Sequence, residues 1–202
     1  MKSRPKWQTV ASKYIVKDRW LTLRADTCVT PDGDIIEPWY VIEYGDWVNC
    51  LVIDKDNQVI LLQHYRQGIK EYVTEIVGGG IDVDETPEVA MARELQEEIG
   101  YQGGQLYSTG VSYVNPHNQN NRVHFFVAID GAMTAATTKE VGADFIVEAV
   151  DLKEFVKNIR NPQYVARFQS LHLASIFCAF NFIRRAGADS SRLHEVDSII
   201  NS

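Results

Sequence analysis

Three glutamates, Glu94, Glu97 and Glu98, stand within five consecutive positions of a stretch in which residues 79–101 carry seven carboxylates. On a helix they share one arc, because each residue turns the chain by about 100°. Like charges three or four positions apart repel by roughly a few tenths of a kcal/mol per pair. The neighbouring Arg93 can offset one of them. A solvated acidic face is the plain alternative, so a chemical role needs further support.

A divalent cation is the chemical agent that would remove this repulsion. Mg²⁺ favours carboxylate oxygens combined with waters and substrate phosphates. Three glycines, residues 78–80, precede the acidic helix, and there the backbone can adopt φ > 0 or approach a ligand closely. A simple turn is the other reading of the triplet. Together the glycines and glutamates predict a Mg²⁺ platform for a phosphate substrate, with Gly80 among the substrate contacts.

Local signals define the helix that must present these carboxylates. Thr86 is a suitable N-cap, Pro87 suits the first turn, and Gly100 suits the end of the helix after residue 99. The face expected to pack against a sheet comprises Met91, Ala92, Leu95 and Ile99.

The remaining chain alternates strands and helices. Residues 13–46 predict two strands around the Asp32-Gly33 turn, and further strands are expected at "VNCLVID", "VILLQHY", "EYVTEIVGGG", "VHFFVAI" and "FIVEAV". Asp151 opens a short helix, and residues 163–185 have helical periodicity. The last 15 residues are expected to be a loosely docked tail. This mixed order predicts an α/β or α+β sandwich.

Composition limits the other possibilities. A chain of 202 residues can bury one main core, and its net charge of -7 argues against a nucleic-acid partner bound through a broad basic face. Three widely spaced cysteines favour a reduced, cytoplasmic setting. There is no secretory signal pattern, and the most apolar stretch, residues 171–183, is shorter than the ~20 residues of a membrane span, so no membrane partner is expected.

The acidic stretch resembles the Nudix box over its whole length, G-x5-E-x7-R-E-U-x-E-E-x-G-U with U a bulky apolar residue, from Gly79 to Tyr101. The resemblance implies a Nudix α/β/α sandwich with a mixed sheet, and hydrolysis of a nucleoside diphosphate derivative that depends on Mg²⁺ or Mn²⁺. It further implies that Glu85 supports the loop and helix. The metal ligands it implies are Glu94 and Glu98, with Glu97 as a further ligand or as a base. Arg93 joins the catalytic set.

"QHYRQ" followed by "TEIVGG" resembles the ADP-ribose pyrophosphatase branch of the family, which acts on nucleoside diphosphate sugars. On this resemblance Arg66 contacts the diphosphate, Glu75 supports the site, and the Gly78 carbonyl is a metal ligand. Pro116 lies over the terminal ribose, with His117 a possible contact. Residues 1–46 then form a small antiparallel sheet that builds a homodimer and contacts the base, before a Nudix domain at 47–202. The aromatic residues expected at the base are Trp20, Trp39 and Tyr40.

Two features leave alternatives open. The branch has an acid five residues after the proline, where this chain has Asn121, so another sugar nucleotide such as GDP-mannose remains possible. The branch also places its general base in the loop before the strand "FIVEAV". Glu140 is the first candidate there, Asp144 the second, and Glu97 of the helix the third. The five histidines show no metal-ligand spacing, and His124 and His172 are interpreted as ordinary strand and helix residues.

Two functions other than an enzyme are compatible with the acidic helix. One is a nucleotide-sensing protein that keeps the fold without turnover, and the other is a structural protein with a solvated acidic helix. The intact set of Glu94, Glu97 and Glu98 favours the enzyme, because a sensor does not need a metal cluster.

Overall fold

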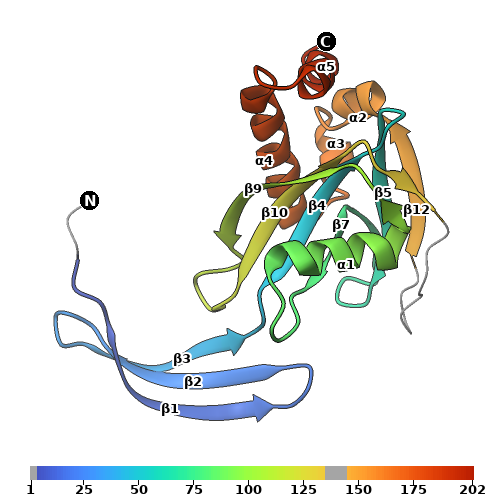
Figure 1. Cartoon of the computed structure of the whole chain (residues 1–202). Coiled ribbons are helices and arrows are strands. Elements are labelled where there is room, and N and C mark those ends of the chain that lie inside the picture. The colour runs from blue at the N-terminus through green and yellow to red at the C-terminus, as the bar shows by residue number, and fades with distance from the viewer. Residues whose placement is uncertain (1–3, 135–144) are drawn as a thin grey trace. The chain divides into compact units, whose positions relative to one another are not determined.

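The computed structural model describes residues 4–134 and 145–202 and divides into two compact units (Figure 1). Unit 1 comprises Met1–Asp46 and Tyr113–Arg122, and unit 2 comprises Trp47–Ser112 and Val123–Ser202. Each unit is described separately below.

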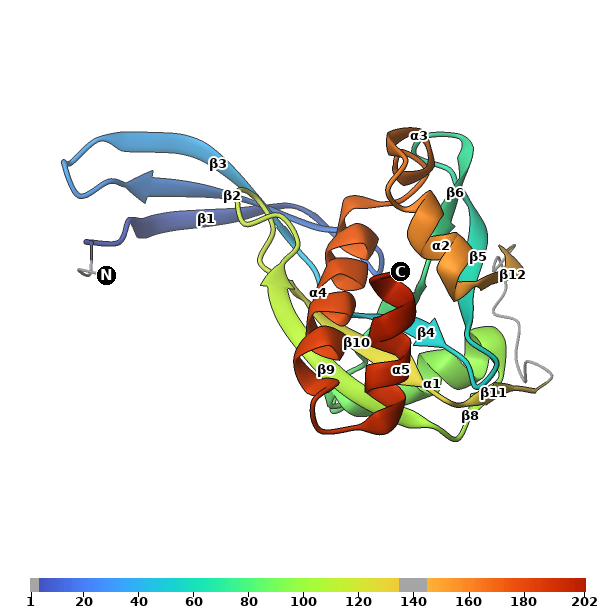
Figure 2. The same ribbon diagram turned by 90° about the horizontal axis from the view of Figure 1, so that it is seen from above.

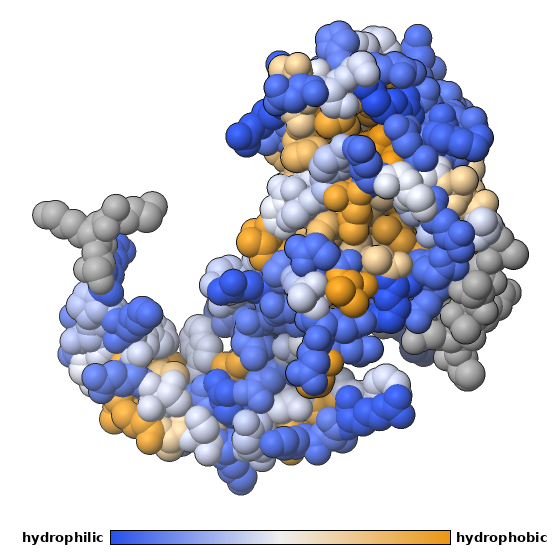
Figure 3. Space-filling view, in the orientation of Figure 1, coloured by the Kyte–Doolittle hydropathy of each residue, from blue (hydrophilic) through white to orange (hydrophobic). Residues whose placement is uncertain are grey.

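Unit 1 is a three-stranded antiparallel sheet in the order β1 (Gln8–Lys17), β2 (Thr22–Val29), β3 (Ile35–Glu43). The turn between β2 and β3 contains Gly33 at φ 91°, as the Asp-Gly pair predicts. β1 begins well before residue 13, where strand structure was first expected. Its side chains are almost all exposed, and hydrophobic residues stand among hydrophilic ones on the surface of this sheet (Figure 3). The exposed apolar residues of this segment are Trp7, Val10, Tyr14 and Ile15.

The segment 113–122 joins unit 1 through hydrogen bonds to the end of β3 and the residues after it. The Ile42 amide donates to the carbonyl of Asn118 at 2.8 Å, and the Tyr44 amide donates to Oδ1 of Asn120 at 3.1 Å. Asn121, which is 1% exposed, donates from Nδ2 to the carbonyl of Gly45 at 3.1 Å. The asparagine-rich loop is therefore fixed by its own side chains and backbone.

Unit 2 is built on a seven-stranded mixed sheet with the order β12-β5-β4-β10-β9, in which β6 also pairs with β5 and β7 with β4. β4 and β10 run parallel, and the β4–β5, β4–β7, β5–β6 and β5–β12 pairs run antiparallel. β8 (Tyr101–Gln102) and β11 (Ala132–Met133) form a separate antiparallel pair. The bounds of the seven strands are β4 Trp47–Ile53, β5 Gln58–Arg66, β6 Glu71–Glu75, β7 Val77–Gly80, β9 Gln105–Tyr113, β10 Arg122–Ile129 and β12 Phe145–Asp151.

One face of this sheet carries α1 (Pro87–Ile99), the predicted acidic helix. Thr86 caps it by accepting from the Val89 amide at 3.4 Å, and Gly100 ends it at φ 62°, both as predicted. Its buried residues are Ala90, Met91, Leu95 and Ile99, which pack on Val48, Cys50, Val52, Ile60 and Leu62 of the two central strands. Met91, Leu95 and Ile99 are buried as predicted, whereas Ala92 is exposed and Ala90 is buried in its place.

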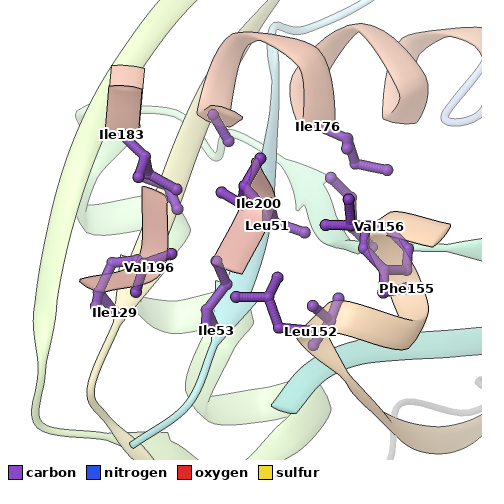
Figure 4. Packing of buried hydrophobic residues seen from close by; sticks show 14 of the residues in the cluster. Leu51, Ile53, Ile129, Leu152, Phe155, Val156, Ile176, Ile183, Val196 and Ile200 are labelled. Atoms are coloured by element: carbon purple, nitrogen blue, oxygen red, sulfur yellow. The ribbon is translucent and has the colours of Figure 1, made fainter. Parts of the chain in front are cut away.

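The opposite face carries α2 (Leu152–Asn158), α4 (Ser170–Ala186) and α5 (Ser191–Ile200), seen from a second direction in Figure 2. Asp151 caps α2 through the Glu154 amide at 3.0 Å, as the sequence predicts. Leu51 and Ile53 of β4 meet Ile176, Ile183 and other side chains of these helices in a second core (Figure 4). Helices on both faces of a mixed sheet confirm the predicted α/β/α sandwich.

Two expectations about the C-terminal region are wrong. The single helix expected over 163–185 is broken into α3 (Pro162–Val165) and α4, because the chain turns at residues 166–169 before it resumes. The expected loose tail is α5, capped by Ser190 through the Leu193 amide. Its residues Leu193, Val196 and Ile200 are buried, since the i, i+3, i+7 spacing gives this short helix an apolar face. None of the described helices is long and apolar enough to cross a membrane.

Candidate active site

A cavity of about 490 Å³ in unit 2 brings together side chains from β4, β5, α1 and α4 around the glycine strand β7. Its lining residues are Trp47, Asn49, His64, Arg66, Gly78, Gly79, Gly80, Asp82, Arg93, Glu94, Glu98, Gln169, Leu171 and His172. Six of the residues predicted from sequence are among them: Arg66, Gly78, Gly80, Arg93, Glu94 and Glu98. A second cavity of about 500 Å³, beside α2 and the end of α5, contains none of these residues.

Two of the three glycines of β7, Gly78 and Gly79, are needed for close packing rather than for unusual backbone angles. They belong to a strand paired with β4, and none of the three is among the positive-φ glycines. A Cβ placed on Gly79 would lie 2.2 Å from Oε1 of Glu94, and one on Gly78 would lie 2.5 Å from Oδ1 of Asn49. Because glycine has no side chain, the carboxylates of α1 can lie directly against the strand.

Arg93 holds the acidic helix to the loop before it. Its Nε and Nη2 donate to the two oxygens of Glu85 at 2.9 and 3.0 Å, and Nη2 also donates to the Gly80 carbonyl at 2.9 Å. Nη1 donates to Glu94 at 2.7 Å and to Glu97 at 3.2 Å. The Arg93 guanidinium lowers the pKa of Glu85. Arg93 thus contacts two of the three clustered glutamates, one more than the sequence suggested, and organises the loop and helix as a unit.

Glu98 is the carboxylate that this arginine does not contact. Its Oε2 accepts a hydrogen bond from the Gly78 amide at 3.1 Å. The pKa of Glu98 is raised to about 8, chiefly by burial and in smaller part by the nearby charges of Glu94 and Glu75, against the lowering effects of that amide and Arg66. The ionised form therefore needs an additional positive charge at this place.

The oxygen donors of this region fit a hard divalent cation. Glu94 and Glu98 line one cavity, and their negative charges repel each other when both are ionised. A cation bound between them would remove this repulsion. Within residues 4–134 and 145–202, no three Asp, Glu, His or Cys side chains already converge on one ion-sized position. The donor set is thus two carboxylates with main-chain oxygens, and Mg²⁺ accepts such a partial set because it keeps waters and substrate phosphates as ligands.

Arg66 enters the cavity from β5 and is held in place by Glu75 of β6. The two residues form a bidentate pair, with Nε to Oε1 at 2.7 Å and Nη2 to Oε2 at 2.5 Å. Glu75 is 2% exposed, and Nδ1 of His64 lies 3.4 Å from its Oε2. Such a paired, planar guanidinium is well suited to face a phosphate group.

Sequence reasoning missed several polar residues of this cavity. Asn49 interrupts an apolar strand, and His172 lies on α4, some 120 positions later. Both are buried, as is Ser175, whose Oγ donates to the Asn49 carbonyl at 3.5 Å. A polar residue inside a continuous apolar run was the available signal at Asn49. No sequence spacing connects it to His172, because only the fold brings them together.

The aromatic residues predicted to contact the base belong to unit 1. Trp39 packs edge-on against Trp7, with ring centroids 5.5 Å apart, and against His117 at 4.9 Å. Trp20 is 77% exposed, and the Arg19 guanidinium lies 4.6 Å from its ring centroid. Tyr40 is also exposed. The loop carrying Pro116 and His117 thus meets β3 within this unit.

The three candidate bases have different places. Glu97 is bound by Arg93, has a side chain 33% exposed, and is not among the residues lining the cavity. Glu140 and Asp144 lie outside the described residues.

The sandwich, the glycine strand and the carboxylate helix are those of a Nudix protein, and the chain belongs to that family. The NUDIX domain matches residues 43–168, and the nucleoside diphosphate sugar hydrolase N-terminal domain matches residues 7–42. These matches confirm the predicted resemblance to the Nudix hydrolases and to their nucleoside diphosphate sugar hydrolase branch. Members of this family generally require divalent metal ions.

Relatives in sequence and in structure include hydrolases named for nucleotide substrates. The chain is 23% identical over 145 residues to the ADP-ribose pyrophosphatase of Bacillus subtilis (strain 168), covering 72% of this chain and 77% of that one. It is 28% identical over 130 residues to the GDP-mannose pyrophosphatase of Escherichia coli O1:K1 / APEC, covering 59% of this chain and 68% of that one. A crystal structure of ADP compounds hydrolase has the same fold, with a TM-score of 0.78, 17% identity, and coverage of 93% of this chain and 99% of that chain.

Proposed function

We propose that this protein hydrolyses the diphosphate bond of ADP-ribose, or of a related nucleoside diphosphate sugar, to a nucleoside monophosphate and a sugar phosphate. The observation that carries the proposal is the composition of one cavity. Arg66, fixed by Glu75, lies with Glu94 and Glu98 around the same glycine strand. Anion-binding and cation-binding groups that share a cavity are suited to a diphosphate that carries metal ions.

The residues of the cavity would have two roles, metal binding and diphosphate binding. Glu94, Glu98 and the Gly78 carbonyl would hold Mg²⁺, for which Mn²⁺ is a possible substitute, with Glu97 as a further ligand. The bound cation would supply charge neutralisation on phosphate oxygens. Arg66 would orient the diphosphate through its guanidinium and neutralise charge that develops on a non-bridging oxygen during attack by water.

A carboxylate has to take the proton of the attacking water. Glu140 is our first candidate, Asp144 the second, and Glu97 the third. Arg93 would act by holding Glu94, Glu97 and the Gly80 carbonyl in register, so we assign it a positioning role.

We assign the nucleoside contacts to unit 1, with Trp20, Trp39 and Tyr40 at the base and Pro116 and His117 at the sugar. A homodimer formed through the N-terminal strands is part of the proposal. The exposed apolar residues of β1 support it, because a strand with almost no buried side chains gains stability when a second chain covers it.

The test is a substrate panel at fixed enzyme concentration, with ADP-ribose, GDP-mannose, UDP-glucose and dinucleotides, each with Mg²⁺ and with EDTA. Nucleoside monophosphate released from ADP-ribose or another sugar nucleotide only in the presence of the ion supports the proposal. Tight binding of the same compounds without release would instead support a nucleotide sensor. Light scattering measures the oligomeric state independently.

GDP-mannose is a specific second candidate. Asn121 occupies the place where the ADP-ribose branch has an acid, and its amide is buried in a hydrogen bond to the Gly45 carbonyl. This position therefore offers no carboxylate to a terminal ribose. A higher kcat/KM for GDP-mannose than for ADP-ribose in the panel would favour this candidate.

A further inference from the structure

His172 is a buried histidine that lines the candidate active site without a role in the box or branch motifs. It lies in the first turn of α4, is 6% exposed, and shares the cavity with Arg66, Glu94 and Glu98. A buried histidine on a helix is most simply a packing residue. Its hydrogen bonding argues for more than packing.

One ring nitrogen of His172 is committed to the backbone. Nδ1 accepts a hydrogen bond from the Ile76 amide at 3.1 Å, at the single residue between β6 and β7. A nitrogen that accepts cannot carry a proton, so the neutral ring bears its proton on Nε2. The fold therefore selects one tautomer and presents one N–H donor.

The charge state of the ring is equally constrained. Burial lowers the pKa of His172 to about 4, while the facing groups Glu75 and Arg66 act in opposite directions, Glu75 raising it and Arg66 lowering it. The ring is neutral near pH 7. It can thus donate to an anion without adding a titrating charge to the cavity.

The Nε2 donor of His172 is open to the cavity. Among the described residues it makes no hydrogen bond, and it is not one of the fully buried side-chain atoms that lack a partner, so it keeps some exposure at the wall of the cavity that His172 lines. Arg66 and the glycines of β7 line the same cavity. An oxygen-rich ligand in this cavity is the partner that the geometry leaves available.

We propose that His172 is a substrate-binding residue that donates a hydrogen bond from Nε2 to a non-bridging phosphate oxygen of the diphosphate, an inference that rests on the proposed function. Arg66 and His172 then offer a charged donor and a neutral donor to the same cavity. The hydrogen bond from Ile76 fixes the ring, so the donor is preorganised before substrate arrives.

Two substitutions separate this role from a structural one. In His172→Asn the amide oxygen can replace Nδ1 as acceptor for Ile76, but nothing replaces the Nε2 donor. In His172→Gln the longer amide can place a donor near the Nε2 position, but the Ile76 amide loses its fitted acceptor. Hydrolysis kinetics and thermal unfolding of the full chain are measured for both, with ADP-ribose and Mg²⁺.

We expect the two variants to rank in opposite order for activity and for thermal stability. His172→Asn should lose about 10- to 100-fold in kcat/KM, the range for a hydrogen bond to a charged group, with a Tm close to that of the native chain. His172→Gln should retain more activity than His172→Asn despite a lower Tm. Activity that simply follows Tm, with His172→Gln the worse of the two, overturns the proposal and leaves His172 a structural residue.

A second measurement does not depend on turnover. The full chain labelled with ¹⁵N-histidine is titrated with inorganic pyrophosphate and Mg²⁺ and followed by NMR. We expect a ring protonated on Nε2 and a downfield shift of its proton on titration. A ring protonated on Nδ1, or a His172 signal unmoved at saturating pyrophosphate, overturns the proposal. If the native chain hydrolyses nothing in the substrate panel, the proposed function fails, and the NMR result alone decides the role of His172.

Discussion

Two groups of residues that line the candidate active-site cavity differ in how their charges are compensated. The first group, Glu94 and Glu98, is called the carboxylate wall; its negative charge is compensated only in part, because Arg93 donates to Glu94 but not to Glu98. The second group, Arg66 and His172, is called the donor wall; it is fixed by protein partners, Glu75 for the guanidinium and the Ile76 amide for the ring.

This difference shows which components must come from outside the chain. The carboxylate wall is incomplete without a cation, as the pKa of about 8 for Glu98 indicates. The donor wall is already organised, and what it lacks is an anion. A metal-bound diphosphate supplies both at once, so each wall should respond differently to substitution.

The largest effect is expected on the carboxylate wall. Glu98→Gln keeps the shape of the side chain and removes its charge, so kcat should fall by about three orders of magnitude, because metal-ion stabilisation contributes several kcal/mol. Steady-state hydrolysis of ADP-ribose with Mg²⁺ measures it. Glu88→Gln, exposed in the first turn of the same helix, is the matched control and should retain native activity. Equal activity of the two variants would remove the distinction between Glu98 and an ordinary surface carboxylate.

A smaller loss is expected from the donor wall. Arg66→Lys retains the charge but not the planar fork, so kcat/KM should fall by about 10- to 100-fold with the metal requirement unchanged. Activity titrated against Mg²⁺ concentration checks both points. Arg184→Lys, the same exchange at an exposed arginine of α4, serves as the matched control and should retain native activity. A shifted Mg²⁺ requirement in Arg66→Lys would show that the two walls are not functionally separate.

Glu75 should act only through the donor wall. Glu75→Gln weakens the hold on Arg66, and we expect about a 10-fold loss of kcat/KM. The double variant with Arg66→Lys should lose little more than Arg66→Lys alone, since both changes remove one arrangement. Kinetics of the two single variants and the double variant complete the cycle. Losses that multiply would assign Glu75 a function of its own.

The last prediction concerns stability and pH rather than activity. The pKa of His172 is about 4 in the native state against 6.5 for a free histidine, so the unfolded chain binds more protons between these values. The free energy of unfolding should therefore fall as the pH falls from 6.5 to 4, by at most about 3 kcal/mol from this residue. Urea unfolding across this range measures the slope. It should flatten in His172→Asn and persist in His194→Asn, an exposed histidine of α5. An unchanged slope in His172→Asn would contradict the buried neutral ring.

The carboxylate wall was predictable from sequence, whereas the donor wall was predictable only in part. Thr86, the glutamates and Gly100 lie within one helix, where spacing alone fixes which side chains share a face. A family resemblance predicts Arg66 and Glu75. No local sequence signal indicates His172, because its hydrogen bond with the Ile76 amide spans 96 positions. The tail was misjudged for a related reason, since α5 is stabilised by packing in the core rather than by local signals.

Binding of Mn²⁺ to the native chain and to the Glu94→Gln/Glu98→Gln double variant, followed by the electron paramagnetic resonance signal of the free ion, tests the central claim most directly. The account predicts that the native chain depletes the free-ion signal in the presence of ADP-ribose and that the double variant restores it. Equal depletion by both proteins would contradict the account, because the ion would then be held somewhere other than the carboxylate wall.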